Sequence, residues 1–131
     1  MRYVLDTSAY SAFRRSHAAI KTLIETANEI ILPPIVIGEL LYGFTIGSRE
    51  ARNRAELQGF LSQPGISIGG LDETTAERYG LISSHVRKAG RSMPTNDVWI
   101  AAFAMQHGLE IITTDRHFTW LPQVSTRLFG P

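Results

Sequence analysis

The chain has 131 residues, of which 44% are hydrophobic and 19% charged, so its composition predicts one globular domain over residues 1–131 and argues against disorder. It carries 13 Lys and Arg against 12 Asp and Glu, and this near-zero net charge excludes no class of partner. With no cysteine, disulfide scaffolds and thiolate zinc sites are excluded, and because no apolar run approaches the ~20 residues of a membrane span, we expect a cytoplasmic protein.

The first half of the chain alternates apolar runs with helical patterns. A double proline opens one of the helices, because proline is tolerated in the first helical turn, where its missing N–H costs nothing. In chain order we expect a strand over residues 2–5, a helical stretch over 8–27 broken near residue 16, a strand over 29–32, a helix over 34–44 and a helix over 48–61.

The second half continues the alternation. Thr74 to Glu77 fits a capping box at the start of one helix, and Gly108 stands where a glycine typically ends another. In chain order we expect a strand over residues 65–71, helices over 74–89 and 95–107, and strands over 110–113 and 124–128. Strands separated by helices predict a three-layer α/β/α fold with a central, mostly parallel sheet of four or five strands.

Four carboxylates occupy positions where a charge is costly. Asp6 ends the first apolar strand, Glu39 interrupts an apolar helix, Asp97 begins another, and Asp115 follows the strand over 110–113. An unpaired buried carboxylate is strongly destabilising, and four together would repel one another. A divalent cation relieves both costs, and a site made only of oxygen ligands favours Mg²⁺, with Mn²⁺ able to substitute.

The predicted topology brings the four acids together. Ligands of open α/β sheets bind beyond the carboxyl ends of the strands, where Asp6 and Asp115 fall. Glu39 lies within two helical turns of such an end. The helix begun by Asp97 must finish near the opposite edge of the sheet, so its N-terminus points back toward the carboxyl ends of the strands. We therefore expect Asp6 and Asp97 to be the principal metal ligands, Glu39 and Asp115 to complete the site, and Thr113, Ser8 and Asn96 to hydrogen-bond the ligands.

Each acid taken alone has a purely structural alternative. Asp6 fits a helix N-cap, Asp97 fits the favourable end of a helix dipole, and Asp115 fits a turn after a strand. Glu39 fits a buried ion pair with an arginine. The convergence of all four at one sheet edge favours a shared cause, which is a metal site.

Two further features stay open at this point. His117, two residues after Asp115, is a structural histidine, a metal ligand or a substrate contact. Arg49, Arg52 and Arg54 form either a solvated helix face or a surface for phosphates or a protein partner.

A Mg²⁺ ion held by a few carboxylates suits phosphodiester hydrolysis, because it can bind a phosphate oxygen and supply an activated water. The four acids lie in the segments Val4-Leu5-Asp6-Thr7-Ser8, Ile37-Gly38-Glu39-Leu40-Leu41-Tyr42-Gly43, Pro94-Thr95-Asn96-Asp97-Val98-Trp99-Ile100-Ala101-Ala102-Phe103-Ala104 and Ile112-Thr113-Thr114-Asp115-Arg116-His117-Phe118. In these segments the chain resembles the PIN-domain ribonucleases, specifically the VapC-like toxins of toxin–antitoxin modules.

This resemblance implies a PIN-like fold and a Mg²⁺-dependent endoribonuclease that cuts structured RNA. It further implies a homodimer and a cognate antitoxin protein that neutralises the enzyme. The alternative is a housekeeping or catalytically degenerate PIN domain that binds RNA or protein, against which the presence of Asp6, Glu39, Asp97 and Asp115 argues. Gly38 departs from the pattern, since relatives often carry a bulkier residue before the glutamate.

Overall fold

The computed structural model describes residues 1–131 and contains one five-stranded sheet in which every neighbouring pair is parallel. The strand order is β3-β2-β1-β4-β5. The strands are β1 (Arg2–Leu5), β2 (Glu29–Leu32), β3 (Ile66–Ile68), β4 (Glu110–Thr113) and β5 (Thr126–Leu128). The predicted α/β class is confirmed, and the sheet takes the larger of the two expected strand numbers.

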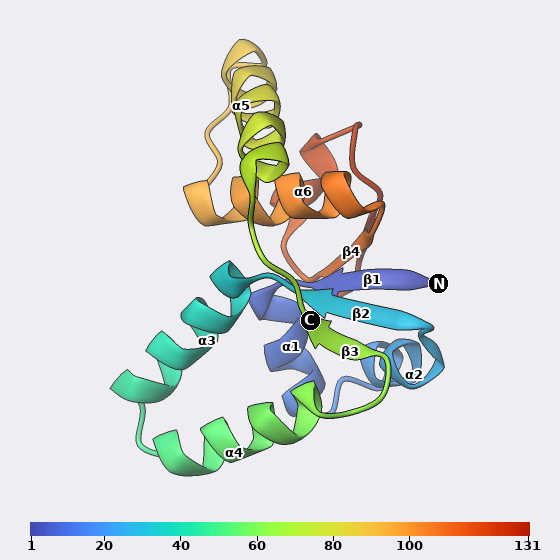
Figure 1. The fold of residues 1–131 in the computed structure, drawn as a ribbon, viewed down its shortest axis with the longest axis vertical. Coiled ribbons are helices and arrows are strands. Elements are labelled where there is room, and N and C mark those ends of the chain that lie inside the picture. Colours follow the sequence, from blue (N-terminus) through green and yellow to red (C-terminus); the bar gives the residue numbers. More distant parts are fainter.

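The helices cover both faces of the sheet. In Figure 1, α1 to α4 lie below the strands, and α5 and α6 lie above them. This follows from right-handed crossovers, because the chain steps from β1 to β3 in one direction and then reverses to reach β4. The helices are α1 (Thr7–Arg14), α2 (Ala18–Thr26), α3 (Pro34–Ile46), α4 (Glu50–Leu61), α5 (Glu73–Lys88) and α6 (Thr95–His107).

The reversal of strand order creates a switch point between β1 and β4. At such a point, the helices that leave the two strands depart to opposite faces and open a crevice beyond the carboxyl ends. Asp6 directly follows β1, and Asp115 lies two residues beyond β4. The topology therefore places these two acids on either side of the switch point.

The helix over residues 8–27 breaks where the sequence predicts. Ser16, between α1 and α2, has a φ of 66°, a left-handed conformation that no helix continues through. Gly108 ends α6 with a φ of 64°, as expected of a glycine after a helix C-terminus.

None of the helices combines the length and the apolar character needed to cross a membrane.

The predicted cap of α5 is wrong by two residues. The N-cap is Asp72 and not Thr74: the Asp72 carboxylate accepts a hydrogen bond from the Thr75 N–H at 3.1 Å, and the Thr75 hydroxyl accepts one from the Asp72 N–H at 3.0 Å. Both aspartate and threonine side chains can accept a backbone N–H at the N-cap, so residue type alone does not fix the first residue of the helix.

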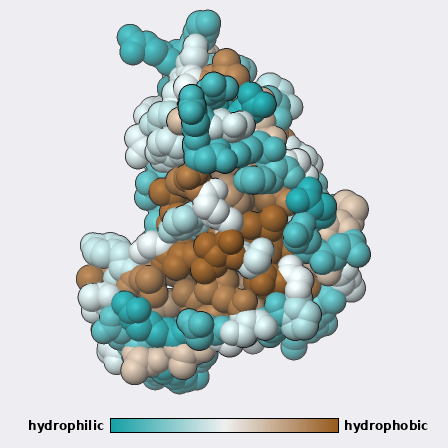
Figure 2. All heavy atoms as spheres, viewed as in Figure 1, coloured by the Kyte–Doolittle hydropathy of each residue, from teal (hydrophilic) through white to brown (hydrophobic).

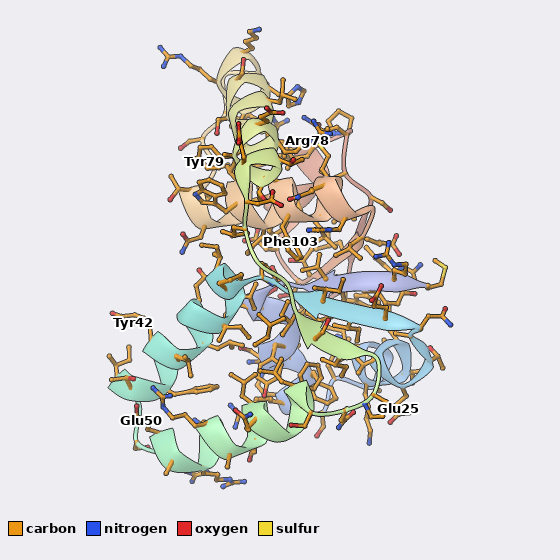
Figure 3. All side chains as sticks on the ribbon, viewed as in Figure 1. Glu25, Tyr42, Glu50, Arg78, Tyr79 and Phe103 are labelled. Atoms are coloured by element: carbon orange, nitrogen blue, oxygen red, sulfur yellow. The ribbon has the colours of Figure 1, made fainter.

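Helix α5 packs on α6 and stands away from the sheet (Figure 1). The rings of Tyr79 and Trp99 stack at 4.2 Å between these two helices, while Phe103 lies between α6 and the sheet and is completely buried (Figure 3). The loop that leads into α5 passes so close that a Cβ on Gly69 would lie 2.8 Å from the Phe103 ring. Because α5 projects outward, the segment after it can return the chain to the carboxyl edge, where α6 begins.

Candidate active site

Asp6 is 4% exposed at the junction of β1 and α1. One of its carboxylate oxygens accepts hydrogen bonds from the Ala9 N–H at 2.8 Å and the Ser8 hydroxyl at 2.7 Å. The other oxygen accepts the Thr113 hydroxyl at 2.6 Å. Burial nevertheless raises the pKa of Asp6, because these hydrogen bonds offset only part of the desolvation. Asp6 therefore both caps α1 and presents a fixed carboxylate at the switch point.

Thr113, the last residue of β4, connects the two sides of the crevice. Its buried hydroxyl donates to Asp6 and accepts the Asp115 N–H at 2.8 Å. The Ser8 hydroxyl adds a second connection by accepting the Thr114 N–H at 3.0 Å. These bonds fix the ends of β1 and β4 relative to each other, and with them the carboxylates that follow.

We expect Thr113→Val to lower the free energy of unfolding by about 1–3 kcal/mol, because it leaves the Asp115 N–H without an acceptor and removes a donor from a buried carboxylate. Urea denaturation of the metal-free protein measures this change. Thr113→Ser keeps the hydroxyl and is the matched control. An unchanged midpoint in Thr113→Val would show that the network does not hold the site together.

Glu39 projects from α3 and has no arginine or lysine partner, which excludes the ion-pair interpretation. One carboxylate oxygen accepts the Thr7 hydroxyl at 2.6 Å, and the other accepts the Asn96 side-chain amide at 3.3 Å. These contacts join α3 to the starts of α1 and α6. Glu39 also lines an open cavity of about 660 Å³, together with Tyr42 and Gly38.

Asp97 lies in the first turn of α6, with its side chain 16% exposed. Its pKa is raised from 3.8 to about 6, first by burial and then by the negative charges of Asp115, Asp6 and Glu39; His117 acts in the opposite direction. All three predicted partner acids are therefore close enough to Asp97 to affect its ionisation. No arginine or lysine forms an ion pair with any of the four carboxylates.

The raised pKa of Asp97 predicts a pH dependence of stability. Because the folded protein binds this proton more tightly than the unfolded chain, the free energy of unfolding of the metal-free protein should fall as pH rises from 3.8 to about 6. We expect a fall of about 2 kcal/mol from this group. Denaturation across this interval, compared with Asp97→Asn, measures it, and equal slopes for the two proteins would contradict the assignment.

Asp115 begins a short 3₁₀ helix, η1 (Arg116–Trp120), that the sequence did not predict. Its carboxylate accepts the His117 N–H at 2.9 Å, and the His117 Nδ1 lies 3.0 Å from Asp115 Oδ1 and 3.7 Å from Asp97 Oδ2. One ligand atom from each of these three residues lies within 4.8 Å of the other two. Asp6 and Glu39 are not members of this tight group.

The predicted supporting residues Ser8, Thr113 and Asn96 each hydrogen-bond one of the four acids. Sequence reasoning missed Thr7, although it stands next to Asp6 in the first motif, and left the role of His117 open. The donor set fits a divalent cation, because neighbouring carboxylates raise the pKa of Asp6 and of Asp97 and no Lys or Arg forms an ion pair with any of the four acids.

Comparison with known proteins shows the family of the chain. Residues 3–122 match the PIN domain family. Ribonuclease VapC4 of Mycobacterium tuberculosis is 32% identical over 69% of each chain, and ribonuclease VapC2 of Haemophilus influenzae (strain ATCC 51907 / DSM 11121 / KW20 / Rd) is 28% identical over 88% of this chain and 87% of that protein.

Among solved structures, VapBC2 from Rickettsia felis, bound to a DNA fragment from its promoter, contains a chain with the same fold. The TM-score is 0.85 at 23% identity, over 98% of this chain and 99% of that one. The family match spans most of the sequence and includes Asp6, Glu39, Asp97 and Asp115. The chain belongs to the PIN-domain family and has VapC ribonucleases among its relatives.

Proposed function

We propose that this protein is a Mg²⁺-dependent endoribonuclease and the toxin of a toxin–antitoxin pair. The observation that carries the proposal is the group formed by Asp97, Asp115 and His117, whose ligand atoms all lie within 4.8 Å of one another. Asp6 and Glu39 lie near enough for their charges to raise the pKa of Asp97. The curated relatives named as ribonucleases supply the reaction class. A cytoplasmic location follows from this proposal, since RNA is the substrate.

In this proposal Asp6, Glu39, Asp97 and Asp115 hold Mg²⁺, and Mn²⁺ can replace it. The bound cation supplies Lewis acidity toward a phosphate oxygen and lowers the pKa of water. The protein's own contribution is positioning. Three hydrogen bonds fix the Asp6 carboxylate, and Thr7 and Asn96 hold that of Glu39, so the charges are in place before RNA binds.

An arginine near the acids supports RNA as the substrate. The Arg91 guanidinium lies 4.5 Å above the Trp120 ring, and Trp120 lies 4.8 Å from the ring of His117. Arg87 lines the same surface pocket as Arg91. By contrast, Arg52 and Arg54 on α4 are paired with glutamates in their own helix, which leaves them less available to phosphates.

An apolar surface supports the antitoxin as partner. Figure 2 shows hydrophobic residues gathered in the hollow bounded by α3, α4 and α6 as they are placed in Figure 1. Among the large hydrophobic side chains, Ile46 of α3 is 69% exposed and Ile68 of β3 is 54% exposed. Exposed apolar patches of this kind typically mark protein interfaces. The proposal includes a cognate antitoxin on this surface and a homodimer, as the family resemblance implies.

The test is cleavage of RNA by the protein purified free of any partner. We expect end-labelled RNA to be cut when Mg²⁺ or Mn²⁺ is present, and cutting to stop when the metal is chelated and resume when it is restored. Asp97→Asn, purified in parallel, controls for contaminating nucleases. Cleavage that persists in chelator would contradict the metal dependence, and an intact RNA in every condition would contradict the reaction.

A further inference from the structure

We propose that the Nδ1 atom of His117 is an additional ligand of the metal and shifts the preference of the site from Mg²⁺ toward Mn²⁺. This inference rests on the proposed function, because it assumes a cation among the four acids. It goes beyond an all-oxygen site, since it assigns a nitrogen ligand to the cation.

The position of the imidazole is the first argument. Nδ1 of His117 lies within 4 Å of carboxylate oxygens from two elements, 3.0 Å from Asp115 and 3.7 Å from Asp97. These three residues are the group in the protein whose ligand atoms all lie within 4.8 Å of one another. A cation shared by Asp97 and Asp115 would therefore have Nδ1 as a neighbour.

The second argument is that the ring is held in this orientation. The His117 backbone N–H is bound to Asp115, which fixes the start of η1. Trp120, three residues on, packs its ring edge-to-face with the imidazole at 4.8 Å, and Arg91, from the segment between α5 and α6, lies over the Trp120 ring. A ligand that is oriented before the metal binds loses less conformational entropy on binding.

A nitrogen ligand among oxygen ligands affects which metal the site prefers. Mg²⁺ strongly prefers oxygen ligands and near-ideal octahedral geometry, whereas imidazole nitrogen suits transition metals. Mn²⁺ accepts carboxylate oxygens and, as a transition metal, also binds nitrogen. One imidazole among carboxylates should therefore increase the affinity for Mn²⁺ more than that for Mg²⁺.

Pulsed electron paramagnetic resonance of the Mn²⁺-loaded protein tests the ligand directly. We expect electron spin-echo modulation from a directly bound imidazole nitrogen in the wild type, and its absence in His117→Ala and His117→Asn. His85→Ala is the matched control, because His85 lies in the last turn of α5, outside the group of metal-binding side chains, and this variant should keep the signal.

Mn²⁺ and Mg²⁺ affinities, measured by titration of the same proteins, test the preference. His117→Ala should weaken Mn²⁺ binding about tenfold or more while changing Mg²⁺ binding by about threefold at most. His117→Asn, which offers an amide oxygen, should recover Mg²⁺ affinity without recovering the nitrogen signal. Bound Mn²⁺ without nitrogen modulation in the wild type would overturn this inference and leave the proposed function standing. A wild-type protein that binds no Mn²⁺ would overturn both.

Discussion

Asp97→Asn is expected to reduce RNA cleavage by about a thousandfold or more while leaving the fold intact. Asp97 is the acid whose ionisation responds to Asp6, Glu39 and Asp115 together, so its charge contributes to the attraction of any cation that the group shares. Asparagine has the same shape but no charge. Initial rates on a single RNA, with circular dichroism as the test of folding, measure the effect.

The stability of this variant separates a catalytic role from a structural one. Without metal, at about pH 8, Asp97→Asn should be at least as stable as the wild type. The substitution removes a carboxyl group that is charged at this pH and whose pKa is raised to about 6 in the folded protein. Glu73→Gln is the matched control, since Glu73 is the acidic residue in the first turn of α5. Near-normal turnover in Asp97→Asn would remove Asp97 from the metal ligands.

Asp6→Asn should also abolish cleavage, for a related reason. Asparagine can still cap α1 by accepting the Ala9 N–H, so the local structure should survive the substitution. The variant loses the charge at the switch point and one hydrogen bond, because an amide nitrogen cannot accept the Thr113 hydroxyl.

Millimolar Mg²⁺ is expected to raise the free energy of unfolding by about 2–3 kcal/mol once its concentration reaches about a hundred times its dissociation constant. The physical reason is that the carboxylates repel one another in the folded protein, where the cation removes the repulsion, but lie far apart in the unfolded chain. Thermal denaturation with and without Mg²⁺, at about pH 8, measures the shift in melting temperature.

Two controls make this shift specific. Sodium chloride at matched ionic strength accounts for general screening of charges. Asp97→Asn should lose most of the Mg²⁺ response while melting, in the metal-free buffer, at a temperature at least as high as that of the wild type. A wild-type melting temperature that does not move with Mg²⁺ would favour a purely structural role for the acids.

Much of the fold could be predicted from the sequence because the strands are short, continuous apolar runs and the helices begin and end at strong local signals. The prolines at the start of α3 and the glycine after α6 act through backbone geometry alone and so need no tertiary context. The convergence of Asp6 and Asp115 follows from the general rule that parallel strands share one carboxyl edge.

The remaining errors concern features that depend on tertiary contacts. Asp72 and Thr74 are both favourable N-caps by residue type, and the helix begins after Asp72. The contacts of Thr7 and His117 depend on the approach of α3 and on the turn that follows β4, where η1 forms. No periodicity in the sequence reports such side-chain distances, although both residues stand beside acids that the sequence does identify.

The central claim is that Asp6, Glu39, Asp97 and Asp115 form one pocket for a divalent cation. Crystals of the partner-free protein soaked in Mn²⁺ and measured at an X-ray energy where manganese scatters anomalously test it most directly. We expect an anomalous peak at the carboxyl edge between β1 and β4, in contact with Asp97 and at least one of the other three carboxylates. A fully occupied Mn²⁺ site elsewhere on the protein, with these four acids bound only to one another or to protein side chains, would contradict it.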